Sequence, residues 1–389
     1  GVKSIHRRGS AGADQGGPAG KAEGVQRRLT TRSRPRAANR GEDRMKLSGI
    51  LKGTAAAAIL AASAAVGPAA AADVVLRLSH TTAETMDQGS QAWAVIFKEM
   101  VERGSDGAIE VRILGANAAG AEREQLEKAQ AGINQMTINS EILMPSFFPP
   151  ARILGIPFLF RSNAVAWEVF DGPFGDEFKQ GWRNSTGLRI LGIFNAGFRS
   201  FLNSTKPIHS PADLEGLKIR TGENAAHIAM VRALGGSPVP ISWSEVYTSL
   251  QQGVVDGMEN PPGLAYSMRF HEHLNYLTLD RHLFSVHVAM INEATYEALS
   301  DEQKDLVLEA ARTATTVARA TVLLDERRAL GDLEEAGIEI YAPTSEEYAE
   351  FRDLGRPPVE KMVREDLGDE WVDKLLKAID SAEQSVTQP

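Results

Sequence analysis

The chain of 389 residues contains no cysteine. This absence excludes disulfide frameworks, thiol catalysis, zinc–thiolate sites and iron–sulfur clusters. Aromatic residues are also few, at 6%, but 43% of the chain is hydrophobic, which is enough for a large buried core. The length predicts two or three folding units, because single cores rarely grow beyond about 250–300 residues.

Several motifs of catalysis and nucleotide binding are missing from the sequence after residue 73. It has no G-x-S-x-G, H-E-x-x-H, Walker A or G-x-G-x-x-G pattern. His271 and His273 stand two residues apart and His282 follows, but the spacing of carboxylates and of a third ligand around them is unremarkable. We therefore interpret these histidines as surface or packing residues, and we expect no catalytic residue, no metal and no cofactor.

Charge is distributed unevenly along the chain, whose formal net charge is −9. Residues 1–44 sum to +7 and residues 45–72 to +2, which leaves −18 for residues 73–389. An acidic body argues against non-specific nucleic-acid binding, which depends on a cationic surface. We expect no nucleic-acid partner, and any bound anion must be held by a local site.

The first 72 residues have the pattern of segments that do not belong to the fold. Residues 1–44 are rich in Gly, Arg and Ala without apolar periodicity, which predicts a disordered upstream segment outside the native protein rather than a nucleic-acid arm. Residues 45–72 combine a short positive start, an apolar run at 54–66 and an alanine cleavage site at 69–72. This pattern is typical of a secretory signal peptide, and the apolar run is too short for a membrane anchor. We expect a mature protein from about Asp73, exported to the periplasm.

Strand and helix patterns alternate from residue 73 onward. The hydrophobic periodicity predicts strands at 74–78, 109–114 and 135–139, and helices at 89–103 and 122–131. Such alternation indicates βαβ units and a mostly parallel sheet.

Capping signals mark the second half of the chain. Ser210 before Pro211 predicts a short helical turn that leads to a strand at 217–220. Ser242 with Glu245, and Ser300 with Gln303, fit capping boxes that open two helices. The second helix would run to about residue 335, roughly 50 Å, long enough to lie across two lobes.

Three residues are candidates for ligand binding. Arg220 ends a predicted strand at the carboxyl edge, where open α/β sheets bind ligands, and its planar fork suits a carboxylate. A salt bridge to Glu215 or Glu223 is the structural alternative. Asn260 ends a short strand before two prolines and places an amide at the same edge. Trp243 is either a flat surface for a small ligand or a core residue.

Further motifs occur in order between residues 156 and 261. They are Ile156-Pro157-Phe158-Leu159-Phe160, Gly197-Phe198-Arg199 with Asn203, the run from Ser210 to Arg220, Leu234-Gly235-Gly236-Ser237-Pro238-Val239-Pro240, Glu245-Val246-Tyr247 and the run from Gly253 to Pro261. Together with the layout of residues 73–389, they resemble the solute-binding subunits of tripartite ATP-independent periplasmic (TRAP) transporters, the family of dicarboxylate and organic-acid receptors.

This resemblance implies an α/β, two-lobed periplasmic binding fold with mixed sheets and a long C-terminal helix that spans both lobes. Lobe I would comprise residues 73–198 with about 286–325, and lobe II residues 199–285 with about 326–389 packed on it.

The resemblance also implies the roles of particular residues. Arg220 would form the main salt bridge to a ligand carboxylate, with Asn260 bonding the same group and Arg199 assisting. Trp243 falls where the family places an aromatic ring against the ligand. In the opposite lobe, the implied residues are Glu141 and Glu122, with His80 in a loop within reach of the cleft.

The sequence departs from the family pattern at two places. Met258 stands where the family often has Gln, and Thr221-Gly222-Glu223-Asn224 follows Arg220 where the family has Val and a Pro-containing loop. The carboxylate anchor is intact in spite of these changes.

The predicted function is that of a receptor that captures an organic acid anion and delivers it to the membrane permease subunits of a TRAP transporter. C4-dicarboxylates, sugar acids and 2-oxo acids remain open as ligands. Arg199 could serve a second carboxylate, whereas an Arg199 that shares the first one favours a monocarboxylate such as a uronate. A periplasmic enzyme with Glu259 or His80 as general base, and the binding module of a signalling system, are the alternatives.

Overall fold

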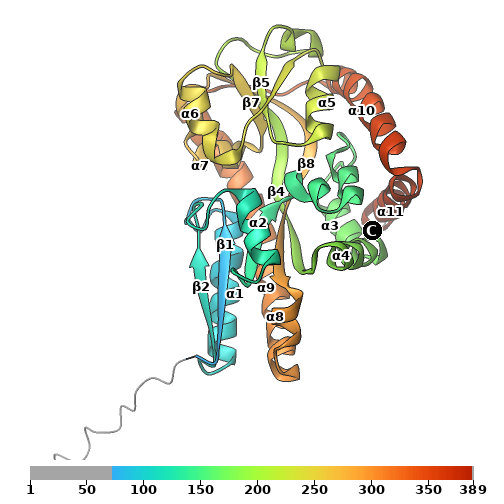
Figure 1. Ribbon diagram of the computed structural model, residues 1–389. Helices are drawn as coiled ribbons and strands as arrows, with labels where there is room; N and C mark the ends of the chain where they lie inside the picture. Colours follow the sequence, from blue (N-terminus) through green and yellow to red (C-terminus); the bar gives the residue numbers. More distant parts are fainter. Residues whose placement is uncertain (1–71, 388–389) are drawn as a thin grey trace, which may run out of the picture. The chain divides into compact units, whose positions relative to one another are not determined.

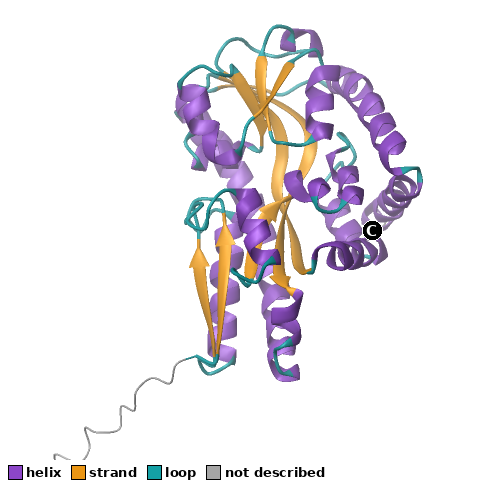
Figure 2. Cartoon of the chain, viewed as in Figure 1, coloured by secondary structure: helices purple, strands orange, loops and turns teal. Residues whose placement is uncertain are grey.

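The computed structural model describes residues 72–387. The predictions for residues 1–44 and, except for Ala72, for residues 45–72 therefore lie outside the described part. Within it, one mixed sheet holds nine strands in the order β2-β1-β3-β8-β4-β7-β5-β6, with β9 paired to β8 (Figures 1 and 2). The strands are β1 Val74–His80, β2 Ile109–Leu114, β3 Met136–Ser140, β4 Leu188–Asn203, β5 Lys218–Thr221, β6 Ser237–Pro240, β7 Gly257–Asn260, β8 Tyr276–Asn292 and β9 Glu339–Tyr341.

Helices connect and cover these strands. The α-helices are α1 Gly89–Gly104, α2 Glu122–Gln130, α3 Asn163–Asp171, α4 Pro173–Thr186, α5 Ala225–Ala233, α6 Val246–Gln251, α7 Pro262–Ser267, α8 Glu293–Glu297, α9 Asp301–Glu335, α10 Ser345–Leu367 and α11 Glu370–Thr387. The 3₁₀ turns are η1 Glu141–Ser146, η2 Pro149–Gly155, η3 Pro211–Leu214, η4 Trp243–Glu245 and η5 Phe270–His273. Among the described residues, none of the helices combines the length and the hydropathy needed to cross a bilayer.

Two long strands, β4 and β8, form the centre of the sheet. They pair antiparallel from Leu188 opposite Asn292 to Asn203 opposite Tyr276. On one side β8 pairs antiparallel with β3, and on the other β4 pairs antiparallel with β7. The prediction of a mostly parallel sheet is therefore wrong at the centre, while the mixed sheet implied by the family resemblance is confirmed.

Apart from β9, which pairs parallel with β8, the parallel strands form two separate groups at the ends of this central pair. One group is β2-β1-β3 and the other is β7-β5-β6. Each group has its own βα connections, so that two lobes share β4 and β8. This arrangement brings the carboxyl end of β5 and the end of β7 together, because Arg220 lies in register with Met258.

The long helix α9 contacts both groups of elements. Its N-terminus has the predicted capping box: the Ser300 N–H donates to Gln303 Oε1 at 3.0 Å, and the Gln303 N–H donates to Ser300 Oγ at 3.2 Å. The helix packs against α1 and β4, and further along against α7 (Figure 1). A continuous 35-residue helix thus runs beside the strands that the two lobes share.

The second predicted capping box, at Ser242, is wrong. The Ser242 side chain makes no capping hydrogen bond, and its Oγ instead lies 3.4 Å from Ser244 Oγ. The chain forms the 3₁₀ turn η4 at Trp243 and becomes α-helical only at Val246. The Glu245 N–H, which a capping box would pair with Ser242 Oγ, donates to the Ser242 carbonyl oxygen at 3.0 Å instead.

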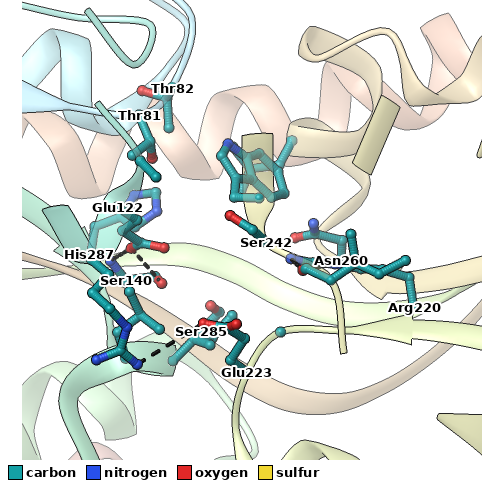
Figure 3. A pocket seen from close by; sticks show the side chains of 18 of the residues that line it. Thr81, Thr82, Glu122, Ser140, Arg220, Glu223, Ser242, Asn260, Ser285 and His287 are labelled. Atoms are coloured by element: carbon teal, nitrogen blue, oxygen red, sulfur yellow. Dashed lines mark hydrogen bonds and ion pairs between the residues drawn. The ribbon is translucent and has the colours of Figure 1, made fainter. Parts of the chain in front are cut away.

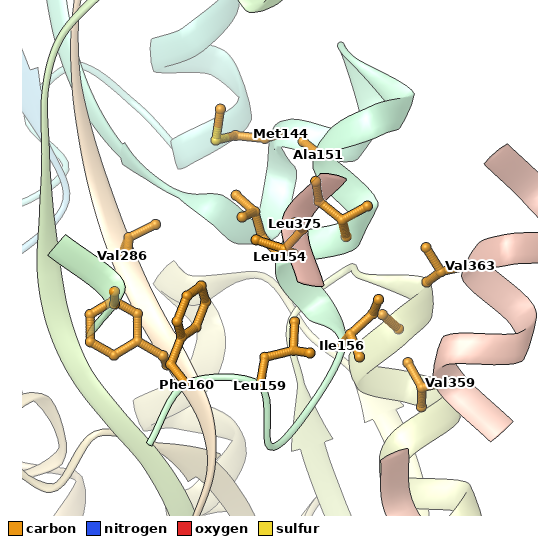
Figure 4. Close-up of a cluster of buried hydrophobic side chains, with 14 of the residues drawn as sticks. Met144, Ala151, Leu154, Ile156, Leu159, Phe160, Val286, Val359, Val363 and Leu375 are labelled. Carbon is orange, nitrogen blue, oxygen red and sulfur yellow. The ribbon is translucent and has the colours of Figure 1, made fainter. Parts of the chain in front are cut away.

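The largest hydrophobic cluster includes residues from widely separated elements. Figure 4 shows part of it, where η2 and the loop after it meet the C-terminal helices, with Leu154 and Ile156 near Leu375 and Val359. α10 packs against α5 and η2, whereas α11 packs against α3 and α4. The C-terminal segment therefore contacts residues within both predicted lobe ranges.

Candidate ligand-binding site

A pocket lies between the ends of β5 and β7 on one side and the segments after β1 and β3 on the other. Its space, including the open mouth, is about 670 Å³. It is lined by Thr81, Thr82, Ala121, Glu122, Arg123, Ser140, Ile142, Leu143, Arg199, Arg220, Gly222, Glu223, Ile241, Ser242, Trp243, Asn260, Leu264, Ser285 and His287. Figure 3 shows Arg220 and Asn260 next to each other, with Glu122, Ser140 and His287 across the space.

Arg220 extends from β5 and is only 2% exposed. Its Nε and Nη2 donate to the carbonyl oxygen of Ile241, at 3.0 and 2.7 Å, and this fixes the plane of the guanidinium. Nη1 is buried and has no hydrogen-bond partner among the described residues. Burial lowers the pKa of Arg220 to about 10, so that the side chain is still cationic at neutral pH. No salt bridge to Glu215 or Glu223 forms in the described part of the chain.

Asn260 ends β7 and is 1% exposed. Its Oδ1 accepts a hydrogen bond from Arg199 Nη1 at 3.3 Å. Its Nδ2 is buried and, like Nη1 of Arg220, has no partner in the described residues. Two neighbouring strand ends therefore each present a donor without an acceptor at the same pocket.

Arg199 lines the pocket beside Asn260, but its guanidinium is bonded within the protein. Its Nε bonds the carboxylate of Glu259, and its Nη2 donates to the carbonyl oxygen of Glu259. All three side chains are almost fully buried. The charge of Arg199 is thus neutralised within the protein, and its visible role is to fix the orientation of the Asn260 amide.

Glu259 is at the centre of a buried network of charged groups. Its carboxylate lies 3.3 Å from His227 Nδ1 and 3.4 Å from His282 Nε2, and His282 Nδ1 lies 2.7 Å from Asp280. Burial alone would raise the pKa of Glu259, but Arg199 and the histidines outweigh burial and hold that pKa well below its usual range. Burial also opposes protonation of His282, yet Asp280 and Glu259 raise its pKa to about 9.

Trp243 forms part of the same wall of the pocket. Its ring packs edge-on against Phe270, and the guanidinium of Arg220 lies 5.8 Å from the ring centroid. A cation over an indole face is favourable, more so where water is excluded. Trp243 therefore helps to position Arg220 and also lines the pocket.

The opposite wall consists mainly of hydrogen-bond acceptors and hydroxyl groups. Oε1 of Glu122 accepts from the Ser140 N–H at 2.6 Å and from Ser140 Oγ at 2.8 Å. Burial raises the pKa of Glu122, although Arg220 and Arg199 oppose this rise. His287 is held by Ser90 Oγ at 3.0 Å, and burial lowers its pKa to about 4.

Two residues that the family resemblance implied do not line the pocket. Glu141 is 1% exposed and accepts from Ser285 Oγ and the Val286 N–H, and burial raises its pKa to about 7 although Arg199 opposes this. His80 is fully buried, with its ring nitrogens at Gln91 Oε1 and Thr82 Oγ1. Both residues support the wall from behind.

The sequence did not single out several lining residues. They are Thr81, Thr82, Ser140, Ser285 and His287. Ser140 directly follows the strand predicted at 135–139, and this position could have marked it. Thr81 and Thr82 follow β1, which ends at His80, two residues beyond the predicted end. Ser285 and His287 lie within β8, whose pairing partners are far away in the sequence and give no local signal. The described residues hold no cluster of His, Asp or Glu arranged for a metal ion.

Comparison with known proteins identifies the class of protein. Residues 78–366 match the family model described as bacterial extracellular solute-binding protein, family 7, and the chain belongs to this family. A solute-binding protein of Verminephrobacter eiseniae is 36% identical over 271 residues, which cover 70% of this chain and 80% of that protein.

Solved structures give the same result. The sugar acid binding protein DctPAm from Advenella mimigardefordensis, in complex with galactonate, superposes with a TM-score of 0.76 at 28% identity over 79% of this chain and 98% of the other. A TRAP periplasmic solute binding protein from Roseobacter denitrificans with bound L-galactonate superposes with a TM-score of 0.72 at 31% identity over 78% and 99%. The two-lobed fold implied by the sequence motifs is therefore confirmed.

Proposed function

We propose that this protein is the receptor subunit of a TRAP transporter and that it binds a polyhydroxylated monocarboxylate. The observation that carries the proposal is the pair of buried donors, Arg220 Nη1 and Asn260 Nδ2, at neighbouring strand ends. A buried donor without a partner costs about 1–3 kcal/mol, and more when it is charged. A carboxylate supplies two acceptor oxygens in the geometry of such donors and compensates the charge of Arg220.

The pocket supports one carboxylate rather than two. Arg199 is neutralised by Glu259, and Arg123 at the mouth lies 4.0 Å from Glu223. A second carboxylate on the ligand would face Glu122, an acidic group on the opposite wall. Ligand hydroxyl groups suit this wall, because they can donate to a carboxylate and exchange hydrogen bonds with serine and threonine. The sugar acids bound by the two structural relatives have this chemistry.

The geometry of the buried acids and histidines favours binding over catalysis. Glu259 is buried in an ion pair with Arg199 and has no access to the pocket space. Both ring nitrogens of His80 have hydrogen-bond partners, and burial lowers its pKa. Neither candidate general base is positioned to take a proton from a bound ligand, which must lie within hydrogen-bond reach of the base.

Export and delivery complete the proposed function. The signal-peptide pattern at residues 45–72 supports export through a cleaved leader, and family membership supports transfer of the ligand to membrane permease subunits. We assign residues 73–198 with 286–325 to one lobe and residues 199–285 to the other. The lobes would close about β4, β8 and α9, because the ligand contacts both walls only when they meet.

Thermal unfolding with a panel of ligands tests this function. The purified protein, freed of co-purified ligand by unfolding and refolding, is mixed with aldonates, uronates, C4-dicarboxylates and neutral sugars. A ligand at about a thousand times its dissociation constant adds roughly 4 kcal/mol and raises the melting temperature by several degrees. We expect shifts with aldonates or uronates only. Shifts with dicarboxylates alone would overturn the ligand class, and no shift with any acid would overturn the function.

A matched pair of arginine variants tests the anchor. Arg220→Ala is expected to weaken binding by about 2–5 kcal/mol, because the ligand carboxylate loses its buried, charged hydrogen-bond donor. Arg112→Ala removes an arginine of an exposed ion pair with Glu110 on β2 and should leave the affinity unchanged. Isothermal calorimetry gives both affinities, and near-native binding by Arg220→Ala would show that the anchor lies elsewhere.

A further inference from the structure

The connection between β5 and α5 lies against η1 at the edge of the pocket. It consists of Gly222, Glu223 and Asn224, in the segment where the sequence departs from the family pattern. Gly222 and Glu223 line the pocket, as does Ile142 of η1. Arg220 lies two residues before this connection, and Ser140 lies two residues before Ile142. The contact therefore joins the strand that carries the carboxylate anchor to the wall that faces it.

Asn224 is the polar centre of this contact and is 4% exposed. Its Oδ1 accepts from the Ala226 N–H at 2.9 Å and caps the N-terminus of α5. Its Nδ2 donates to the carbonyl oxygen of Ile142 at 3.0 Å. One amide thus performs two separable tasks, because the capping task needs only an oxygen and the bond to Ile142 needs the N–H₂ group.

Gly222 allows the connection to pack directly against the side chain of Ile142. A Cβ atom at this position would lie 2.6 Å from Cγ2 of Ile142 and 3.2 Å from its Cδ1. Real Cβ atoms do not come as close as 2.6 Å to another carbon, so a larger residue at position 222 would have to displace the Ile142 side chain and disturb this contact. The close approach depends on the absence of a side chain rather than on an unusual backbone conformation.

A weaker contact lies at the mouth of the pocket. Arg123 Nη2 is 4.0 Å from Glu223 Oε2, and the same nitrogen donates to Ser146 Oγ at 3.3 Å. Both charged side chains are about half exposed, so their attraction is screened by water. The buried hydrogen bond from Asn224 to Ile142 is therefore the main polar contact between the β5–α5 connection and η1.

We propose that Asn224 is a positioning residue for ligand retention, which holds the wall with Arg220 against the wall with Glu122 through its bond to Ile142. This inference rests on the proposed function, because it names what keeps a captured anion in that site. When the bond forms, a ligand bound to Arg220 is covered by the opposite wall. When it breaks, the walls separate more readily and the ligand dissociates faster.

Two substitutions separate the tasks of Asn224. Asn224→Ser keeps a good N-cap for α5 and removes the donor to Ile142, whereas Asn224→Ala removes both. We expect Asn224→Ser to have the melting temperature of the unliganded wild type and to release ligand about three- to tenfold faster by stopped flow, the range of one net hydrogen bond. Asn224→Ala should release ligand as fast as Asn224→Ser, and its melting temperature should be lower because α5 also loses its N-cap. A wild-type dissociation rate in Asn224→Ser would overturn the proposal.

A second pair of substitutions, at Gly222 and Ile142, tests the packing of the contact independently of the Asn224 amide. Gly222→Ala is expected to accelerate dissociation because of its clash with Ile142, and Ile142→Ala in the same chain is expected to restore much of the loss. If Gly222→Ala binds and releases ligand normally, the close approach has no role in retention. The same conclusion holds if adding Ile142→Ala does not slow the dissociation from Gly222→Ala.

The last measurement needs no ligand and so separates this proposal from the proposed function. Since the chain has no cysteine, spin labels attach only to cysteines that are introduced. Glu127→Cys on α2 and Arg232→Cys on α5 place one label at an exposed position on each side of the contact. We expect Asn224→Ser to shift the distance distribution of the unliganded protein to longer values than in wild type. Identical distributions would overturn the role of Asn224, even where the ligand panel succeeds, and a shift would support it even where the panel fails.

Discussion

Arg199 shows how a residue's neighbours decide its role. Its guanidinium bonds Glu259 on one side and the Asn260 oxygen on the other, so the amide of Asn260 is turned with its N–H₂ group free. The amide orientation that a carboxylate requires is therefore set by a charge that is already paired with Glu259. The sequence predicted that Arg199 lies at the site, but it could not reveal the ion pair with the adjacent Glu259.

The free amide of Asn260 leads to a test with two substitutions. Asn260→Ala removes one donor and should weaken binding about tenfold, the value of a single good hydrogen bond. Asn260→Asp keeps the bond from Arg199 but presents a negative oxygen to the ligand carboxylate, and it should weaken binding at least a further tenfold. Calorimetry at pH 7 checks the order, and an Asp variant that binds as well as the Ala variant would contradict it.

The buried histidine His282 predicts how stability depends on pH. Its folded pKa of about 9 exceeds the unfolded value of 6.5, so the folded state holds an extra proton between these values. This contribution is complete below pH 6.5 and is lost as pH rises towards 9. The wild-type melting temperature should therefore fall between pH 7 and 9.

A paired variant assigns this alkaline slope to His282. In the double variant His282→Gln with Asp280→Asn, the proton and its partner charge are both removed, so the slope between pH 7 and 9 should flatten even if the whole curve is lower. Differential scanning calorimetry at several pH values measures it. A slope equal to that of wild type would mean that another group titrates there.

At the scale of elements, local signals in the sequence were sufficient for short strands and capped helices. The strand at 109–114 and the helix at 122–131 depend on hydrophobic periodicity within one window, and the structure contains both almost residue for residue. The long strands β4 and β8 could not be predicted in the same way. Residues such as Leu188 and Asn292 are more than a hundred positions apart, and their pairing is decided by tertiary packing.

In the candidate site, too, some residues could be predicted from local sequence and others depend on tertiary packing. Arg220 and Asn260 were predictable because each lies at or next to the carboxyl end of its strand. Ser285 and His287 line the pocket only because the distant strand β8 passes beneath it. Glu141 fell just outside, since the turn of η1 directs it towards Ser285 and Val286 rather than towards the ligand space.

The capping-box patterns at Ser300 and Ser242 lead to different predictions for the free energy of unfolding. Ser300→Ala removes a capping bond at the start of α9 and should cost about 1 kcal/mol of unfolding free energy. Ser242→Ala carries the same chemical change at a position that makes no capping bond, and it should leave the free energy of unfolding unchanged. Urea unfolding measures both. Equal losses in the two variants would contradict the assignment of the caps.

The whole molecule combines two lobes with a shared interior. β4 and β8 belong to one sheet with strands of both lobes, and α9 packs against elements of both. The largest hydrophobic cluster contains Met144 and Val286 from one predicted lobe and Ile219 and Met230 from the other. Each lobe also has a smaller cluster of its own. The largest cluster, β4, β8 and α9 therefore couple the two lobes, and this coupling determines how the protein should unfold.

Thermal unfolding of the unliganded protein is therefore expected to be a single transition in which the calorimetric and van't Hoff enthalpies agree. Two lobes with separate cores would instead give two transitions, and a ligand could then stabilise one of them alone. With the shared strands and core, a bound ligand should shift the entire peak to higher temperature without splitting it, since its free energy of binding is linked to the one folded state. Scanning calorimetry with and without saturating ligand decides between these cases. A resolved second peak, or a ligand shift confined to one of two peaks, would show that the common core does not couple the lobes.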